Sequence, residues 1–187
     1  MPEFLRGQFL IAKPHIRDSN FFKTAVLMVE HNDEGAMGLI VNRPSSATVA
    51  DALEGTVDSK DETLVYVGGP VEPKALFILH NAAHLDPGEE AIVAEILVGS
   101  SAEVFEQVVE AAGDSDQSVQ FRIFAGCSGW GPGQLEGEIA RGDWFLYPAS
   151  QEIVFHDDPY VVWETLVTAV QQAHRILPHP TDNPEWN

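Results

Sequence analysis

The sequence is poor in cysteine and in basic residues. Cys127 is the single cysteine among 187 residues, so no disulfide can form within the chain, which suits a reducing compartment. Lys and Arg number 10 against 29 Asp and Glu, which gives a formal net charge of −19. Because affinity for nucleic acids and anionic lipids depends on neutralising phosphates with Lys and Arg, we expect neither direct nucleic-acid binding nor membrane association.

Long apolar runs and targeting signals are also missing. The longest apolar stretches fall far short of the roughly 20 residues that cross a bilayer. Residues 1–18 have no basic start, no long apolar segment and no small-residue cleavage site, so we do not expect a secretory signal. These absences predict a cytoplasmic protein, and we expect a monomer or weak oligomer.

What the chain does contain is enough apolar sequence for one core. Hydrophobic residues make up 44% of the composition, an ordinary share for a globular protein. A chain of this length can bury roughly 70% of the surface that its unfolded form exposes. We therefore expect one domain over residues 1–177, followed by a Pro-rich tail over residues 178–187.

The predicted strands are short apolar runs bounded by turn residues. They cover residues 8–13, 24–31, 37–42, 64–67, 75–80, 91–98, 119–125, 144–147 and 152–155. The turn at residues 32–35 predicts a β-hairpin between the second and third runs, and the last two runs are expected to pair in the same way. Residues 58–62 are expected to form an acidic turn.

Helices are predicted from capping residues and periodicity. Thr48 caps a short predicted helix over residues 49–53, and Ser100 or Ser101 caps one that ends at Gly113. A final helix is expected to begin at Asp157 and to carry an apolar stripe to residue 177. Many strands beside two sizeable helices, without alternating βαβ order, favour an α+β or two-layer fold with a mostly antiparallel or mixed sheet.

Residues 126–138 are dense in glycine and resemble several catalytic loops without completing any of them. There is no Gly-Lys-Ser/Thr for a P-loop and no G-x-G-x-x-G, and the elbow around Cys127 and Ser128 is one residue short of G-x-S-x-G. A tight structural turn and a reactive thiol at a helix N-terminus remain as interpretations. We expect Cys127 to be buried and unreactive, and we assign no catalytic residue.

Metal and cofactor sites have equally weak support. His80 and His84 are four residues apart without a third ligand, and a zinc pattern needs more thiolates than one. We therefore expect no metal and no cofactor. Aromatic residues gather in the last third of the chain, and a partly exposed Trp beside the glycines would form a shallow apolar binding patch.

Four blocks of sequence resemble the AlgH/YqgE family of small bacterial proteins. They are residues 7–12 with Pro14, Asp18, Phe21 or Phe22, and Thr24; residues 35–44; residues 68–71; and residues 129–136 with Glu138 and Trp144. Cys127 departs from the Tyr that family members more often carry there. The resemblance implies an α/β sandwich of about ten strands, barrel-like, with flanking helices.

The resemblance implies no established enzyme activity. Family members are often labelled transcriptional regulators from effects on gene expression, but the acidic charge and the missing DNA-reading helix favour an indirect effect. The leading interpretation is a non-enzymatic interaction protein that binds a protein or a small ligand in a shallow cleft. The alternative is an unrecognised enzyme that uses residues 126–138.

The predicted cleft combines polar residues and residues with special backbone requirements from the four blocks: Asp18, Asn42, Arg43, Gly69, Trp130, Gln134 and Glu136. Arg43 is informative because basic residues are rare in this chain. It is expected either to brace a loop by pairing with Asp18 or Glu136, or to await an anionic group of a partner. At least one of Gly68 and Gly69 is expected to have a positive φ, because both precede Pro70 at a strand end.

Overall fold

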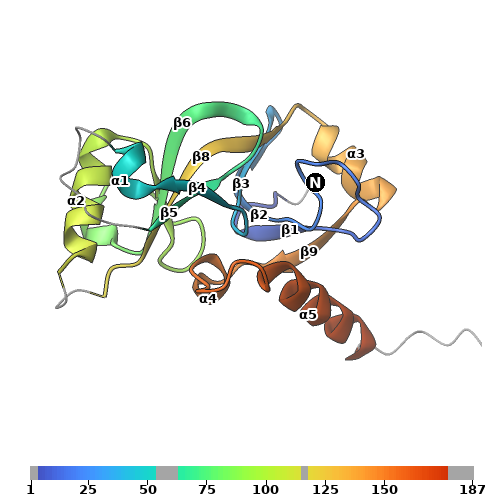
Figure 1. The fold of residues 1–187 in the computed structure, drawn as a ribbon. Helices are drawn as coiled ribbons and strands as arrows, with labels where there is room; N and C mark the ends of the chain where they lie inside the picture. The colour runs from blue at the N-terminus through green and yellow to red at the C-terminus, as the bar shows by residue number, and fades with distance from the viewer. Residues whose placement is uncertain (1–3, 54–62, 115–117, 177–187) are drawn as a thin grey trace, which may run out of the picture.

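The computed structural model describes residues 4–53, 63–114 and 118–176 of the chain (Figure 1). The strands are β1 (Gln8–Ala12), β2 (Ala25–Asn32), β3 (Gly35–Ile40), β4 (Pro44–Thr48), β5 (Leu64–Val67), β6 (Val71–His80), β7 (Leu97–Gly99), β8 (Phe121–Trp130) and β9 (Trp144–Pro148). The helices are α1 (Val49–Ala52), α2 (Ala102–Ala112), α3 (Gln134–Arg141), α4 (Gln151–Val154) and α5 (Val162–Ile176), with a 3₁₀ turn at Ala83–Leu85.

The nine strands form one mixed sheet. Their order is β4-β5-β8-β3-β2-β1-β9, with β6 added on β8 and β7 on β6. Among the described strands, β5 and β8 form the parallel pair, and the other pairs are antiparallel. The predicted mixed sheet with flanking helices is confirmed, but the sheet stays open between β4 and β9 and does not close into a barrel.

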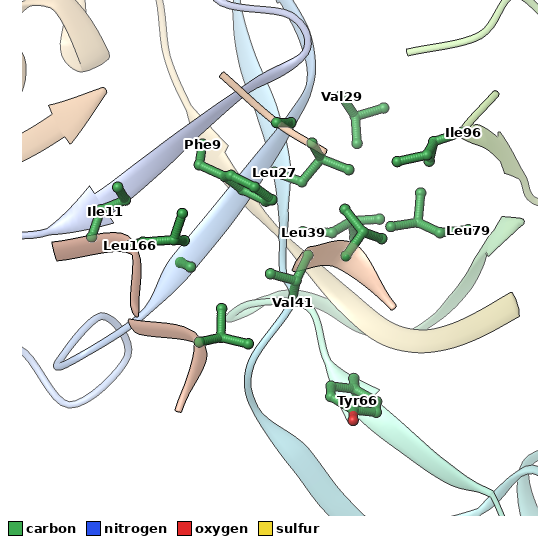
Figure 2. Packing of buried hydrophobic residues seen from close by; sticks show 14 of the residues in the cluster. Phe9, Ile11, Leu27, Val29, Leu39, Val41, Tyr66, Leu79, Ile96 and Leu166 are labelled. Atoms are coloured by element: carbon green, nitrogen blue, oxygen red, sulfur yellow. The ribbon is translucent and has the colours of Figure 1, made fainter. Parts of the chain in front are cut away.

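The centre of the sheet is buried on both faces, which explains why its strands read as continuous apolar runs. In β1, Phe9 and Ile11 belong to the core beneath α4 and α5, whereas Leu10 and Ala12 belong to the opposite core beneath α3. Figure 2 shows the first of these clusters, with Leu166 of α5 beside Ile11 and Phe9. A third cluster packs α1 and α2 against β5, β6 and β8.

The predicted hairpin and two of the predicted helices are present in the structure. β2 and β3 pair antiparallel across the turn after Asn32. Thr48 and Asp51 form a reciprocal capping box at α1, and the Ser101 side chain accepts the N–H of Val104 at the start of α2. Both helices therefore begin where the sequence indicates, and α2 ends at Gly113 as expected.

Three predicted elements differ from the structure. The strand predicted over residues 152–155 is not formed: residues 152–154 belong to helix α4 and Phe155 caps it, and β9 pairs with β1 instead of with a local partner. α5 begins at Val162, five residues after the predicted cap Asp157, which is exposed. Residues 91–98 are mostly irregular, and only residues from Leu97 onward join β7.

Two of the predicted features fall on residues that the structure does not describe. The predicted acidic turn at residues 58–62 and the predicted tail at residues 178–187 lie outside the described residues. No helix in the described ranges is long and apolar enough to cross a membrane.

Candidate functional site

The Gly-rich segment, residues 126–138, is divided between strand β8 and helix α3, with a short connection between them. Residues 126–130 complete β8, and only residues 131–133 connect it to α3. Gly126 is needed because the β5–β6 connection crosses β8 at close range, and a Cβ on Gly126 would lie 2.7 Å from the carbonyl oxygen of Gly69. A Cβ on Gly68 would lie 2.2 Å from the carbonyl oxygen of Gly126. The interpretation that backbones approach closely is therefore supported at Gly126, and the positive φ expected at the Gly68–Gly69 turn is confirmed at Gly69 (φ 153°).

Cys127 is buried within β8, as expected. Desolvation raises the pKa of its thiol, and the carboxylate of Glu72 raises it further. The thiol is therefore held in its protonated form at neutral pH, whereas nucleophilic cysteines need thiolate character. The neighbouring Ser128 is also buried and donates its hydroxyl to the carbonyl oxygen of Gly68 at 3.1 Å.

Trp130 is a packing residue and not an exposed wall of a cleft. It is 5% exposed, and its indole N–H donates to Oε2 of Glu138 at 2.9 Å. Trp144 donates to the same oxygen at 2.9 Å, and Gln134 donates to the other carboxylate oxygen at 3.1 Å. Phe21 stacks on Trp130 with a centroid distance of 6.0 Å. Trp130 and Gln134 thus anchor α3 and the segment around Phe21.

Glu136 binds His31 and not Arg43. The Nδ1 atom of His31 accepts the backbone N–H of Leu5 at 3.1 Å, so the ring proton lies on Nε2 and is donated to Glu136 at 2.9 Å. The pKa of Glu136 is lowered by a hydrogen bond from its own backbone N–H and by the bond from His31. Because both ring nitrogens are occupied, His31 ties the N-terminal segment to α3.

Asn42 and Arg43 follow β3 and hold the segment that joins β1 to β2. Asn42 accepts the N–H of Ala25 at 2.9 Å and donates to the carbonyl oxygen of Lys23 at 3.0 Å. Arg43 donates to the carbonyl oxygens of Asn20 and Phe22. The predicted bracing role of Arg43 is therefore met by backbone carbonyls, which carry no net charge.

Arg43 feels one nearby carboxylate through space but forms no direct ion pair within the described residues. Burial lowers the pKa of its guanidinium, and the carboxylate of Asp18 opposes that shift. Asp18 itself is exposed, and its side chain accepts the N–H of Asn20. None of the ion pairs found within the described residues includes Arg43.

A pocket of about 270 Å³ opens beside Arg43 and is called the Arg43 pocket from here on. Its lining residues come from three segments far apart in sequence: Phe22, Lys23, Thr24, Asn42, Arg43, Pro44, Tyr160, Trp163 and Glu164. Trp163 fixes the α5 side of the pocket, because its indole N–H donates to the carbonyl oxygen of Ala12 at 2.8 Å. Tyr160 at the rim is 76% exposed.

Of the seven residues predicted to share a cleft, Asn42 and Arg43 line this pocket. Asp18 is near enough to Arg43 to affect its pKa. The structure places Gln134 with the Trp130 network and Glu136 with His31, and it packs Gly69 against the backbone of Cys127. The seven residues therefore belong to different environments, and the pair Asn42 and Arg43 lines the pocket.

Sequence reasoning missed the residues that complete the pocket, and it also missed a buried arginine elsewhere in the sheet. Arg122 lies in β8 and donates to the carbonyl oxygens of Val154 at 2.7 Å and His156 at 3.0 Å. Its guanidinium also stacks on the ring of Tyr66 at 4.2 Å, and burial lowers its pKa. The sequence signal that could have identified Arg122 is a charged residue inside the apolar run of β8. Its contacts show that it holds the segment leading into α5.

The histidines do not assemble a metal site within the described residues, where no group of three or more His, Cys, Asp or Glu side chains converges. His80 is fully buried, and its Nδ1 accepts the N–H of Ala82 at 3.3 Å. Its Nε2 lies 3.8 Å from the carboxylate of Asp86 and has no hydrogen-bond partner in the described structure. That the protein binds no metal or cofactor stays a prediction.

Comparison with known proteins gives consistent matches along the chain. The sequence profile of a family described as AlgH-like (DUF179) matches residues 9–175. A UPF0301 protein of Pseudomonas putida is 39% identical over 160 residues, which cover 82% of each chain. One of Methylococcus capsulatus is 36% identical over 162 residues, which cover 84% of this chain and 87% of the relative.

Two solved structures share the fold. The solution structure of AlgH from Pseudomonas aeruginosa superposes with a TM-score of 0.68 at 31% identity and covers 96% of this chain and 97% of that protein. A crystal structure from Corynebacterium diphtheriae gives a TM-score of 0.69 at 24% identity, with coverage of 95% and 90%. The second match supports the fold alone.

Proposed function

Because this chain belongs to the AlgH-like family, and because the resemblance to that family implies no established enzyme activity, we propose that it binds a partner and does not act as an enzyme. The proposed binding site is the Arg43 pocket. The observation that carries the proposal is the guanidinium of Arg43. It is fixed at the pocket by two backbone carbonyls, and it takes part in no ion pair within the described residues. A positioned arginine of this kind is a frequent anchor of binding sites.

The surroundings of Arg43 support a binding role. Phe22 is 41% exposed and Tyr160 is 76% exposed, so two aromatic side chains at the pocket remain accessible. Aromatic and Arg side chains carry a disproportionate share of the free energy of binding at protein interfaces. A pocket of about 270 Å³ accommodates one side chain of a protein partner or one small molecule.

The competing functions have less support. The enzyme interpretation relied on residues 126–138, where the only thiol is buried and its pKa is raised. Direct regulation of transcription requires affinity for DNA, which a net charge of −19 opposes. We expect no sequence-dependent gel shift of duplex DNA at about 0.15 M salt. Any effect on gene expression would then pass through the bound partner.

Site-specific photo-cross-linking tests the proposal. A photoreactive p-benzoylphenylalanine replaces Tyr160 at the pocket rim, and a second variant carries it at Leu146, which is 40% exposed but does not line the pocket. In lysate from a bacterium, the Tyr160 position should give a distinct adduct, either a protein band or a small mass increase. Lys23→Glu should reduce that adduct at least about fivefold, because it reverses one charge of the pocket.

Lys74→Glu is the matched control, since Lys74 is exposed and does not line the pocket. The proposal holds if Lys74→Glu leaves the adduct unchanged while Lys23→Glu removes it. Identical adducts at Tyr160 and Leu146, or equal sensitivity to both charge reversals, would show that the pocket is not the binding site.

A further inference from the structure

We infer that the Arg43 pocket recognises an organic carboxylate whose single negative charge is carried by an aromatic or other apolar group; this inference rests on the proposed binding function. The pocket combines two cations, Lys23 and Arg43, with three aromatic side chains. The chain has only ten basic residues against 29 acidic ones, so two cations in one small pocket are a strong local departure from the rest of the molecule.

Arg43 supplies the recognition of the anion. A guanidinium has five N–H groups, and the described contacts of Arg43 are with the carbonyl oxygens of Asn20 and Phe22. Those contacts fix its orientation and leave N–H groups for a ligand. Because a carboxylate matches the fork of a guanidinium with two parallel hydrogen bonds, it is a suitable ligand for a prepositioned arginine.

The acidic groups near the pocket do not neutralise both cations. Glu164 lies 3.8 Å from Lys23, but the two side chains are 71% and 50% exposed, and exposed pairs at this distance are weak. Asp18 acts on Arg43 through space, but in the described part of the chain it forms no ion pair with the guanidinium, and its side chain accepts the N–H of Asn20. A ligand with one negative charge can therefore bind to Arg43. The Lys23 ammonium can leave its weak pair with Glu164 and bind the ligand as well.

The start of α5 adds to the favourable potential. Trp163 and Glu164 line the pocket and lie in the first turn of this 15-residue helix. The first backbone N–H groups of a helix have no partner within it, and they carry partial positive charge. This feature alone would not define a site, but here it coincides with the two side-chain cations.

The aromatic side chains of the pocket determine which kind of chemical group can carry the carboxylate. The Lys23 ammonium lies 5.1 Å from the Trp163 ring centroid and 5.9 Å from that of Phe22, within cation–π distance of both rings. With Pro44 and the exposed Tyr160, these rings favour an apolar or aromatic body. The volume of about 270 Å³ limits the body to roughly one ring with a short linker.

More highly charged ligands fit less well. A phosphate monoester carries close to two negative charges at neutral pH, and it would approach Glu164 and Asp18 in a protein with a net charge of −19. The balance of charges at the pocket therefore favours a monoanion over a dianion.

A matched pair of small probes tests the inference on the full chain. 3-Phenylpropionate carries one carboxylate and one ring, and 3-phenylpropanamide has the same shape without the charge. Titrations followed by two-dimensional ¹H–¹⁵N NMR should show the acid binding at least about tenfold more tightly, with the shifted signals at Lys23, Thr24, Arg43 and Trp163. Phenyl phosphate should bind more weakly than the acid.

Variants separate recognition from folding. Lys23→Gln should weaken the acid at least about threefold without changing the affinity for the amide, and Lys74→Gln should change neither. Arg43→Lys keeps the charge but loses the bidentate fork, and it should also weaken the acid. Thermal unfolding of each variant identifies any loss of the bracing contacts, and Lys23→Gln remains informative if Arg43→Lys is unstable.

Two further probes distinguish the sources of the carboxylate. N-acetylphenylalanine represents a free small molecule, and an acetylated pentapeptide that ends in phenylalanine represents a chain terminus. Tighter binding of the peptide assigns the ligand to a protein partner, and equal binding assigns it to a small molecule; both results support carboxylate recognition.

Equal affinities for the acid and the amide at the Arg43 pocket would overturn the carboxylate inference while leaving the site itself in place. Stronger binding of phenyl phosphate would overturn it as well. If neither the acid nor the amide shifts the pocket signals, the inference fails, and the cross-linking at Tyr160 decides separately whether the pocket binds another partner.

Discussion

Gly69 passes so close to Cys127 that a Cβ atom on the glycine would lie 2.3 Å from both the carbonyl carbon and the carbonyl oxygen of the cysteine. The approach joins the β5–β6 connection to the centre of β8. Gly69 also has a φ of 153°, a region that residues with a Cβ rarely adopt. Both the conformation and the space at this position therefore require glycine.

Gly69→Ala should destabilise the protein by about 3 kcal/mol or more, because backbone strain and overlap with backbone atoms add. Gly88→Ala is the matched control, since Gly88 is exposed and a Cβ added there would have no heavy atom within 4 Å. Urea unfolding measured by circular dichroism compares the two. Similar free energies of unfolding for both variants would contradict the packing described for Gly69.

Glu138 holds two tryptophans through a single oxygen. Its Oε2 accepts the indole N–H groups of Trp130 and Trp144, each at 2.9 Å. Glu138→Gln should lower the free energy of unfolding by about 1–3 kcal/mol and change the tryptophan emission, because an amide provides one acceptor and places a donor beside the indoles. Glu106→Gln on the exposed face of α2 is the control, and an equally small effect of both substitutions would argue against the network.

His80 should make the stability depend on pH. Burial lowers the pKa of His80, Asp86 opposes this shift, and His84 adds to it slightly. Between that lowered pKa and the ordinary value of about 6.5, the unfolded chain binds more protons than the folded protein. The contribution of His80 to stability is therefore complete above about pH 6.5 and is lost as the pH falls toward the folded pKa.

In His80→Gln, the free energy of unfolding should vary less between pH 7.5 and pH 5 than in the wild type. His84→Gln, at an exposed position, should keep most of the wild-type slope. Denaturant titrations at four or five pH values give the comparison. An unchanged slope in His80→Gln would show that burial of this histidine has no thermodynamic effect.

Cys127 should resist thiol reagents in the folded protein. Its burial and raised pKa predict labelling at neutral pH at least about 100-fold slower than in the unfolded chain. Cys127→Ala should retain binding at the Arg43 pocket. Complete labelling of the native protein within minutes, with the fold intact by circular dichroism, would contradict the structure and reopen the reactive-thiol interpretation.

Local sequence signals predicted much of the secondary structure. The hairpin of β2 and β3, the Thr48 capping box and the Ser101 cap depend on residues within a few positions of one another. The missed strand β4 has the sequence Pro-Ser-Ser-Ala-Thr, which shows no apolar alternation and pairs with β5 from an edge. The extension of β8 through residues 126–130 was missed because glycines usually interrupt strands, whereas here they admit a crossing chain.

The residues of the candidate site could be predicted only in part from the sequence. Asn42 and Arg43 were identified because they are polar residues of a block that resembles the family, and because basic residues are scarce. Tyr160 and Trp163 enter the pocket through the packing of α5, more than 110 residues away along the chain, and no local pattern links them to Arg43. Trp130 was assigned to the cleft for its residue type, but its indole is required inside the core.

The indole N–H signals of an NMR spectrum test the central claim most directly. Trp163 lines the Arg43 pocket, whereas Trp130 and Trp144 bind Glu138. A Trp186→Phe background leaves these three indole signals to follow during a titration with 3-phenylpropionate. We expect the Trp163 signal to shift with saturation while those of Trp130 and Trp144 stay in place. Movement of the Trp130 and Trp144 signals with a stationary Trp163 signal would contradict the assignment of the binding site.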